Sequence, residues 1–195
     1  MERQPSGSKV VKRKLIIITL LVGHGTAKGG SEKPVPPLPY YSWGACPFEC
    51  CTYREWSSNA PTHVLSWKNK NAPVVFELQK GEKVQGVTGV VITTRPGEAE
   101  VLKTTQLGEQ KLKVVPGEVV YILHYEGEGF FKFWVRGQVD SDEFPDKVDP
   151  SSRTGSVLRT IRKAETTWWV KVRNSRGQTG WTTETNHFDH MDACE

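Results

Sequence analysis

Short runs of β-branched and aromatic residues, separated by glycine-containing turns, constrain the fold of this 195-residue chain more than any other feature. Residues 28–195 contain 19 Val and 15 Thr but only 8 Leu and 6 Ala, a composition that favours strands over helices. Turn sequences at residues 95–97 and 175–177 are typical of the breaks between such runs. We therefore expect an all-β protein, with strands at residues 62–67, 74–78, 83–91, 119–125, 130–135, 168–173 and 179–183.

Two segments, residues 99–105 and 158–164, are the only ones for which the sequence also allows a helix. Residues 140–156 contain five acidic residues and two prolines, which predicts a long surface loop. The sequence has no glycine period, no heptad pattern and no second long apolar segment. Collagen-like, coiled-coil and multispanning membrane proteins are thereby excluded.

The N-terminus has the pattern of a secretory signal peptide. Basic residues at positions 9 and 12–14 precede the mostly apolar run 15–22, and small residues follow up to Ala27. This run is far shorter than the roughly 20 residues that a membrane-spanning helix needs. We expect cleavage after Ala27, a secreted or periplasmic mature chain and no stable membrane insertion. An uncleaved anchor and a basic cytosolic tail are the alternatives.

The charge of the chain changes if this segment is removed. The whole sequence has 26 Lys and Arg against 22 Asp and Glu, a formal charge of +4. Residues 1–27 contain five of the basic residues and one of the acidic ones, so 21 of each remain. A neutral chain lacks the positive excess with which proteins bind phosphate backbones. Nucleic acid is therefore not an expected partner.

Four cysteines lie in the mature chain: Cys46, Cys50, Cys51 and Cys194. An even number of cysteines in an exported protein predicts disulfides, here two of them. One of the three possible pairings contains a vicinal bridge, which would strain the peptide between its two residues. Both other pairings join Cys194 to the cluster at residues 46–51, and would therefore connect the two ends of the mature chain.

A zinc site is the alternative use of the same region. His187, His190 and Cys194 could bind zinc together with one of the clustered cysteines, because zinc accepts imidazole and thiolate ligands. Their spacing matches no established zinc motif. We therefore expect disulfides, and no metal or other cofactor.

Two features suggest how the mature chain is organised. Residues 28–45 are rich in glycine and proline, which predicts an extended linker. Residues 76–84 and 112–120 share the pattern apolar, x, apolar, x, x, Gly, Glu, x, Val. Each copy is typical of a strand that enters a glycine turn and leaves as a second strand. The repeat favours two similar domains in tandem.

Two stretches resemble the bacterial SH3 domain. Residues 62–84 resemble its opening half, in which a first strand leads through a loop to an apolar strand and a glycine turn. Residues 168–181 are similar to its closing half, in which a Trp-bearing strand forms a hairpin that ends in Gly-Trp. A single such domain is much shorter than this span. The resemblance implies two small SH3-like barrels in tandem, residues 46–105 and 106–195, or one barrel with a large insertion.

Sequence motifs of the common enzyme classes are absent. The chain has no nucleophile elbow, phosphate-binding loop, H-E-x-x-H zinc motif or dinucleotide fingerprint. A cysteine nucleophile with His124 or His187 as its base would need a free thiolate, which an oxidising compartment disfavours. We expect no enzymatic activity.

Strand alternation predicts a binding surface. In residues 130–136 and 168–173, alternate side chains should point to opposite faces of the sheet. If Phe133 and Val170 face the core, each stretch places a Trp flanked by two cations on the outward face. Such a surface could stack on sugar rings or hold an acidic peptide, whereas packing of both Trp residues between the barrels is the alternative. The candidate binding residues are Lys132, Trp134 and Arg136 in one strand and Trp169, Lys171 and Arg173 in the other.

Together these features predict an exported, non-catalytic, SH3-like binding module of the cell envelope. Its expected partner is peptidoglycan or an envelope protein, bound through aromatic and basic residues. A zinc-binding protein and a secreted inhibitor of a hydrolase are the alternatives.

Overall fold

The computed structural model describes residues 34–144 and 156–194, and these residues form an all-β protein. The only helical element in them is a single 3-10 turn, η1 (Thr185–His187). None of the described segments forms a helix long and apolar enough to cross a membrane. The predicted all-β class is confirmed. The predicted signal peptide and residues 145–155 of the predicted acidic loop lie outside the described residues.

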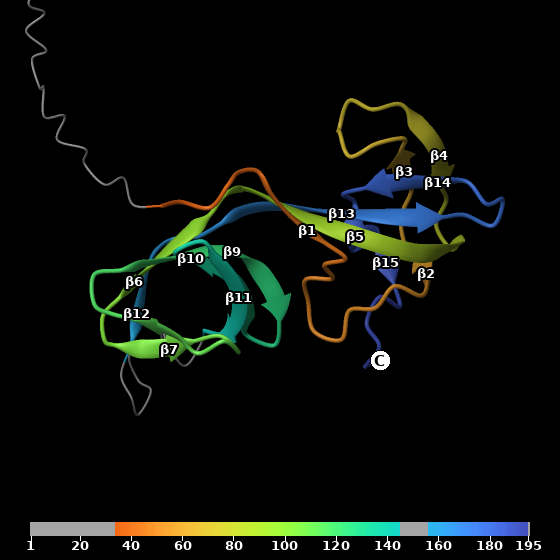
Figure 1. Cartoon of the computed structure of the whole chain (residues 1–195). Helices are drawn as coiled ribbons and strands as arrows, with labels where there is room; N and C mark the ends of the chain where they lie inside the picture. The colour runs from red at the N-terminus through yellow and green to blue at the C-terminus, as the bar shows by residue number, and fades with distance from the viewer. Residues whose placement is uncertain (1–33, 145–155, 195) are drawn as a thin grey trace, which may run out of the picture. The chain divides into compact units, whose positions relative to one another are not determined.

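The larger sheet has eight antiparallel strands that curl around a hydrophobic core (Figure 1). Their order is β15-β2-β5-β13-β14-β3-β4, and β1 also pairs with β5. The strands are β1 (Tyr40–Trp43), β2 (Glu55–Ser58), β3 (Thr62–Leu65), β4 (Val74–Leu78), β5 (Lys83–Arg95), β13 (Glu165–Arg173), β14 (Thr179–Thr182) and β15 (Phe188–Asp189).

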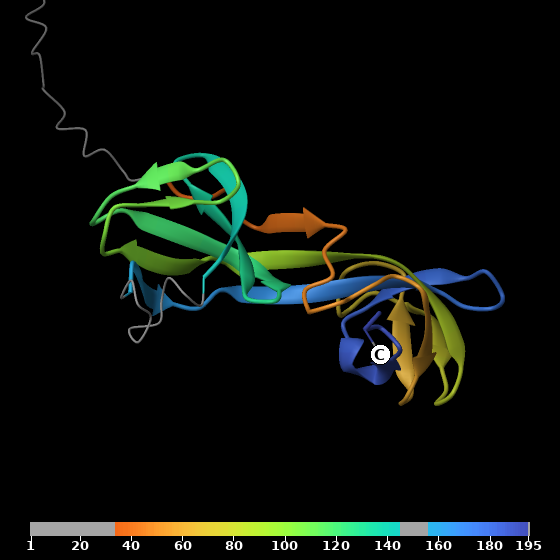
Figure 2. The same cartoon turned by 90° about the horizontal axis from the view of Figure 1, so that it is seen from below.

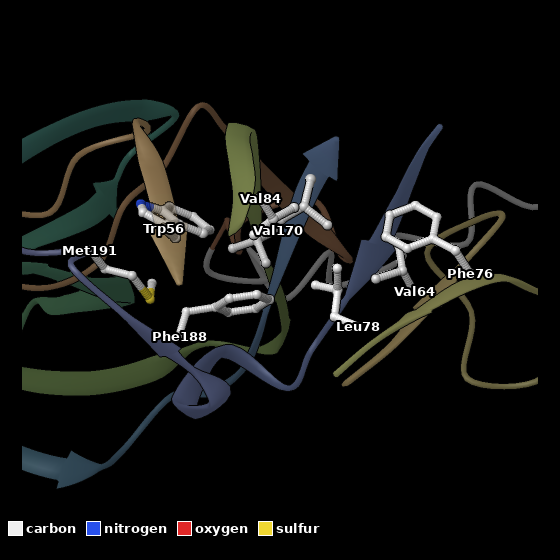
Figure 3. Packing of buried hydrophobic residues seen from close by; sticks show 9 residues of the cluster. Trp56, Val64, Phe76, Leu78, Val84, Val170, Phe188 and Met191 are labelled. Carbon is white, nitrogen blue, oxygen red and sulfur yellow. The ribbon is translucent and has the colours of Figure 1, made fainter. Parts of the chain in front are cut away.

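The core of this sheet is built from side chains on its concave face (Figure 3). Val170 and Val172 of β13 are fully buried there, as strand alternation predicts. Trp56 is also fully buried, and its ring lies 5.5 Å from that of Phe188. The cluster comprises Trp56, Val64, Phe76, Leu78, Val84, Val170, Val172, Phe188 and Met191.

A second sheet of five antiparallel strands has its own core. Its order is β11-β10-β9-β6-β12, and a separate hairpin, β7-β8, packs its Leu107 and Val114 into the same cluster. The strands are β6 (Gly97–Val101), β7 (Thr105–Leu107), β8 (Leu112–Val114), β9 (Val119–Gly127), β10 (Phe130–Val135), β11 (Gln138–Glu143) and β12 (Leu158–Arg162).

In the sequence, the strands of the second sheet lie between two groups of strands of the first sheet. β5 precedes the second sheet and β13 follows it, and the two strands pair along residues 85–95 and 165–173 (Figure 2). The two stretches that resemble an SH3 domain, residues 62–84 and 168–181, therefore lie in one sheet. The expected tandem boundary after residue 105 falls within β7 and separates strands that pair. Residues 96–164 therefore lie between two paired strands of the larger sheet.

All seven predicted strands are present, and neither of the two segments for which the sequence also allows a helix is helical. Residues 99–105 contain the end of β6, a short connection at 102–104 and the first residue of β7, and residues 158–164 contain β12. In β6, buried and half-buried residues alternate along the strand, a period of two that a helix would not give. Residues 140–143 belong to β11 and not to a loop, and residues 40–43 of the expected linker form β1.

The repeated Gly-Glu sequence forms the same turn twice. Gly81 and Gly117 have φ angles of 88° and 85°, in the left-handed region that glycine adopts readily. The carboxylate of Glu82 accepts a hydrogen bond of 2.7 Å from the backbone N–H three residues earlier. Glu118 accepts the equivalent bond at 2.8 Å. The two turns lead into β5 and β9, which are long strands of the two sheets.

The protein has two disulfides, one local and one that joins the N-terminal cysteine cluster to the C-terminal end of the described chain. Cys46 pairs with Cys51, and Cys50 pairs with Cys194. No described cysteine is free. The predicted connection of Cys194 to the cluster is confirmed. Disulfides persist in oxidising compartments, so they indicate a non-cytoplasmic environment.

Gly89 allows this N-terminal segment to pack against β5. A methyl group at Gly89 would lie 2.6 Å from Nε1 of Trp168, and still closer to the Tyr53 hydroxyl. Both of these groups donate hydrogen bonds to the carbonyl of Ala45, next to Cys46. Burial raises the pKa of Tyr53 to about 12, so this hydroxyl stays protonated and a donor at physiological pH.

We predict that Gly89→Ala lowers the free energy of unfolding by about 1–3 kcal/mol, because the new methyl group forces neighbouring atoms apart. Chemical denaturation monitored by circular dichroism measures this loss. The loss should be smaller in a Tyr53→Phe background, where the closest atom is absent. Val87→Ala, at an exposed position of the same strand, is the control. Equal losses for Gly89→Ala and Val87→Ala would contradict the prediction.

Candidate functional site

The alternation predicted for β13 is correct, but the exposure predicted for Trp169 is wrong. Trp169 lies on the face opposite to Val170, and only 4% of it is exposed. It packs against Val90 and Trp181, which cover it on this second face of the sheet. Lys171 and Arg173 remain half-buried and exposed, respectively. Side chains from neighbouring strands therefore bury the Trp that strand alternation alone leaves open.

The prediction for β10 fails in the same way. Trp134 is 6% exposed, and its ring packs edge-on against Tyr121 at 5.7 Å. The two cations beside it are engaged within the protein. Lys132 forms an ion pair of 2.9 Å with Glu126, and Arg136 forms one of 3.1 Å with Glu118.

The two predicted sets therefore do not form one binding surface. Trp134 belongs to a cluster of the five-stranded sheet, and Trp169 belongs to a cluster of the eight-stranded sheet. Of the six candidate binding residues, Lys171 is the one whose charge lies near the rings described next, with its Nζ atom 6.0 Å from the centre of the buried Trp181 ring.

A different group of residues forms an exposed aromatic surface on the eight-stranded sheet. Trp43 and Trp67 are each 62% exposed, and Tyr41 is 44% exposed. The rings of Tyr41 and Trp43 stack at 6.1 Å, and Trp181 meets Trp43 edge-on at 6.4 Å. We call this group the aromatic surface; it consists of Tyr41, Trp43, Trp67, Lys68 and Trp181.

Strand alternation in β1 places two of these rings. Tyr41 and Trp43 point to the solvent side, whereas Ser42 between them is buried. The Ser42 hydroxyl lies 2.7 Å from Nε2 of His124, a buried residue of β9. This hydrogen bond and the pairing of β1 with β5 fix the strand, so the two rings keep their direction.

The loop between β3 and β4 places Trp67 and Lys68. It is closed by a hydrogen bond of 2.9 Å from the Ser66 N–H to the Pro73 carbonyl. Within it, the Asn71 N–H donates to the side chain of Asn69 at 2.9 Å. Such local bonds hold a short loop in one conformation, so Trp67 and Lys68 are presented in a defined way.

Lys68 lies at the centre of the aromatic surface. Its Nζ atom is 4.0 Å from the ring centre of Trp67, 4.5 Å from that of Trp181 and 4.7 Å from that of Trp43. These distances are within the range of favourable cation–π contacts. Burial among the rings, and secondarily the charge of Lys171, hold the pKa of Lys68 below its ordinary value.

Lys171 adds a second positive charge to this surface. It pairs across the strands with Trp181, and its Nζ atom lies 6.0 Å from the centre of that ring. Among the described residues, neither Lys68 nor Lys171 has an ion-pair partner or a side-chain hydrogen bond. The surface therefore combines open aromatic faces with two uncompensated cations.

The histidines and cysteines of the alternative zinc site do not come together as ligands. Cys194 is bonded to Cys50, so it offers no thiolate. His187 contacts Thr62, with Nδ1 at 3.2 Å from the hydroxyl. The two acidic groupings of the described residues with metal-like spacing both include Cys50, whose sulfur is in the same disulfide. A zinc site of the predicted composition is therefore incompatible with the disulfides.

His124, considered as a catalytic base, has both ring nitrogens engaged. Nδ1 lies 2.7 Å from the Tyr125 carbonyl and Nε2 lies 2.7 Å from the Ser42 hydroxyl. Burial lowers the pKa of His124, which favours its neutral form. With every described cysteine in a disulfide, no thiol is present for it to activate.

The five-stranded sheet contributes to an apolar cavity of about 500 Å³. Ile122, Phe131 and Phe144 form much of its wall, and Lys163 lies at its edge. It lacks the combination of stacked rings and paired cations that distinguishes the aromatic surface.

Sequence reasoning missed most of the aromatic surface. Tyr41 and Trp43 were assigned to the linker, because the preceding prolines dominate that segment. Trp67 is the last residue of the strand expected at residues 62–67, and Lys68 begins the loop after it, so neither stands out as a binding residue. The alternation Tyr40-Tyr41-Ser42-Trp43 is the one signal that could have indicated a strand with two rings on one side.

Comparisons with known proteins do not assign this chain to a family, since no family model, curated protein or solved structure matches it. The site is therefore defined by its own geometry.

We predict that Lys68 loses its proton at a lower pH than the exposed lysines do. Titration of the lysine side-chain carbons by NMR measures this directly. Lys171→Met should raise the pKa of Lys68, because it removes the nearby charge, but not to the ordinary value, since burial persists. A Lys68 pKa at or above the ordinary value for a lysine side chain would contradict the account.

Proposed function

We propose that this chain is an exported, non-catalytic binding module of the cell envelope that recognises a glycan-bearing component such as peptidoglycan. The aromatic surface is the binding site in this proposal. It replaces the surface expected around Trp134 and Trp169, whose rings are buried. The observation on which the proposal depends is the exposure of Trp43 and Trp67 on either side of a lysine.

The exposure of these rings supports a binding role. Large aromatic side chains are costly to leave in water, and a contiguous exposed group of them is typical of an interaction site. The flat faces of Trp rings stack on the apolar faces of sugars, while the indole N–H and nearby cations can bond to hydroxyl groups. The held conformation of the β3–β4 loop reduces the entropy that binding would cost.

The disulfides support the proposed location. Two disulfides indicate an environment outside the reducing cytoplasm. Envelope glycans are found in that environment. The sequence pattern of residues 1–27 predicts the export that such a location requires. The likeness of residues 62–84 and 168–181 to a bacterial SH3 domain agrees with a binding module, and these two stretches pair in one sheet.

The alternative functions receive less support. Zinc binding by His187, His190 and Cys194 would need a thiol that is in a disulfide. No observation on the described residues favours an inhibitor of a hydrolase over a glycan-binding module.

A co-sedimentation experiment tests the proposal. The oxidised mature protein is mixed with purified, protein-free cell wall and the bound fraction is measured over a range of wall concentrations. We predict that Trp43→Ala/Trp67→Ala weakens binding at least about tenfold, because Trp residues are typical energetic centres of binding sites.

The matched control is Phe130→Ala/Ile161→Ala, which removes two exposed apolar side chains from the five-stranded sheet. This variant should bind as the wild type does. Thermal unfolding verifies that all variants are folded, which we expect because the four side chains are exposed. Equal binding of both double variants, or no binding of the wild type, would refute the proposal.

A further inference from the structure

The two cations at the aromatic surface lie near Trp rings, whereas several other cations of this protein lie against carboxylates. Lys83 pairs with Glu55, and Arg95 pairs with Glu165. Arg159 and Arg162 pair with carboxylates of β6. Lys68 and Lys171 lie beside one another at the Trp rings without such a partner among the described residues.

This arrangement is electrostatically unfavourable without a ligand. An ammonium group carries three hydrogen-bond donors, and the faces of Trp rings attract its charge without supplying lone pairs. The rings also displace part of the water that would otherwise hydrate Lys68. The two like charges repel each other, so an anion placed between them would relieve the repulsion and accept hydrogen bonds from both.

The neighbouring rings limit what this anion can be attached to. Trp43 and Trp67 are largely exposed, and the centres of their rings lie 4.7 Å and 4.0 Å from the charged Nζ atom of Lys68. A free inorganic anion would leave these faces in water, and an uncharged sugar would leave both ammonium groups without a partner. A cationic ligand would add a third positive charge.

We propose that the aromatic surface selects saccharides that carry a carboxylate, with the pyranose ring on the Trp faces and the carboxylate between Lys68 and Lys171. This inference rests on the proposed function and adds the chemical class of its ligand. Lys171 is then a specificity-determining residue, because it contributes charge near the Trp181 ring but no part of the stacking platform.

Matched saccharides test the inference by isothermal titration calorimetry. The first pair is the disaccharide of N-acetylglucosamine and N-acetylmuramic acid against N,N′-diacetylchitobiose, which is uncharged because it lacks the lactyl group and its carboxylate. The second pair is trigalacturonate against its methyl ester. The first acid represents a peptidoglycan source and the second represents other acidic glycans.

We expect at least one acid to bind at least about tenfold more tightly than its uncharged counterpart, as a charged hydrogen bond would give. This preference should shrink as ionic strength rises. Lys68→Met and Lys171→Met should each reduce the preference to less than about threefold, because each lowers the affinity for the acid and not the affinity for the uncharged sugar. Lys70→Met removes a charge from the same loop without a ring contact, and it should leave the preference intact.

Equal affinities within both pairs would overturn the inference, and so would a preference that survives Lys68→Met and Lys171→Met. Binding of none of the four sugars would overturn it as well. The co-sedimentation experiment separates these failures from failure of the proposed function. If wall binding depends on Trp43 and Trp67 while the sugars show no preference for a carboxylate, the proposed function stands and the proposed ligand class is wrong.

Discussion

The pairing of β5 with β13 is the constraint on which the rest of the structure depends. These strands join segments on either side of the five-stranded sheet and run together over residues 85–95 and 165–173. Val170 and Val172 point from β13 into the core, while Trp169 and Lys171 point to the other face. One strand thereby contributes to the core, to the base of the aromatic surface and to its charge.

The aromatic surface follows from how the second face of this sheet is covered. Trp169 is the inner layer, Trp181 partly covers it, and Trp43 and Trp67 form the outer layer that remains in water. The outer rings come from β1 and from the β3–β4 loop, two segments that meet only when the sheet has formed. The Nζ atom of Lys68 then lies within 5 Å of the centres of three rings, which places its charge at the site.

Local patterns in the sequence predicted the strands well, because alternation and glycine turns are local features. The turns at Gly81 and Gly117 and the inward direction of Val170 are examples. The order of strands in the sheets was not predictable in this way, since it depends on pairing between distant segments. The same reason explains the error on Trp169: alternation gives the face of a side chain, whereas its exposure depends on which strands lie beside it.

The central claim is that Trp43 and Trp67, and not Trp134 or Trp169, contact the ligand. The indole N–H resonances of the tryptophans in a two-dimensional NMR spectrum report on each ring separately. During titration with soluble cell-wall fragments, the account predicts that the resonances of Trp43 and Trp67 shift progressively while that of Trp134 stays in place. Shifts centred on Trp134, with Trp43 and Trp67 unchanged, would contradict it.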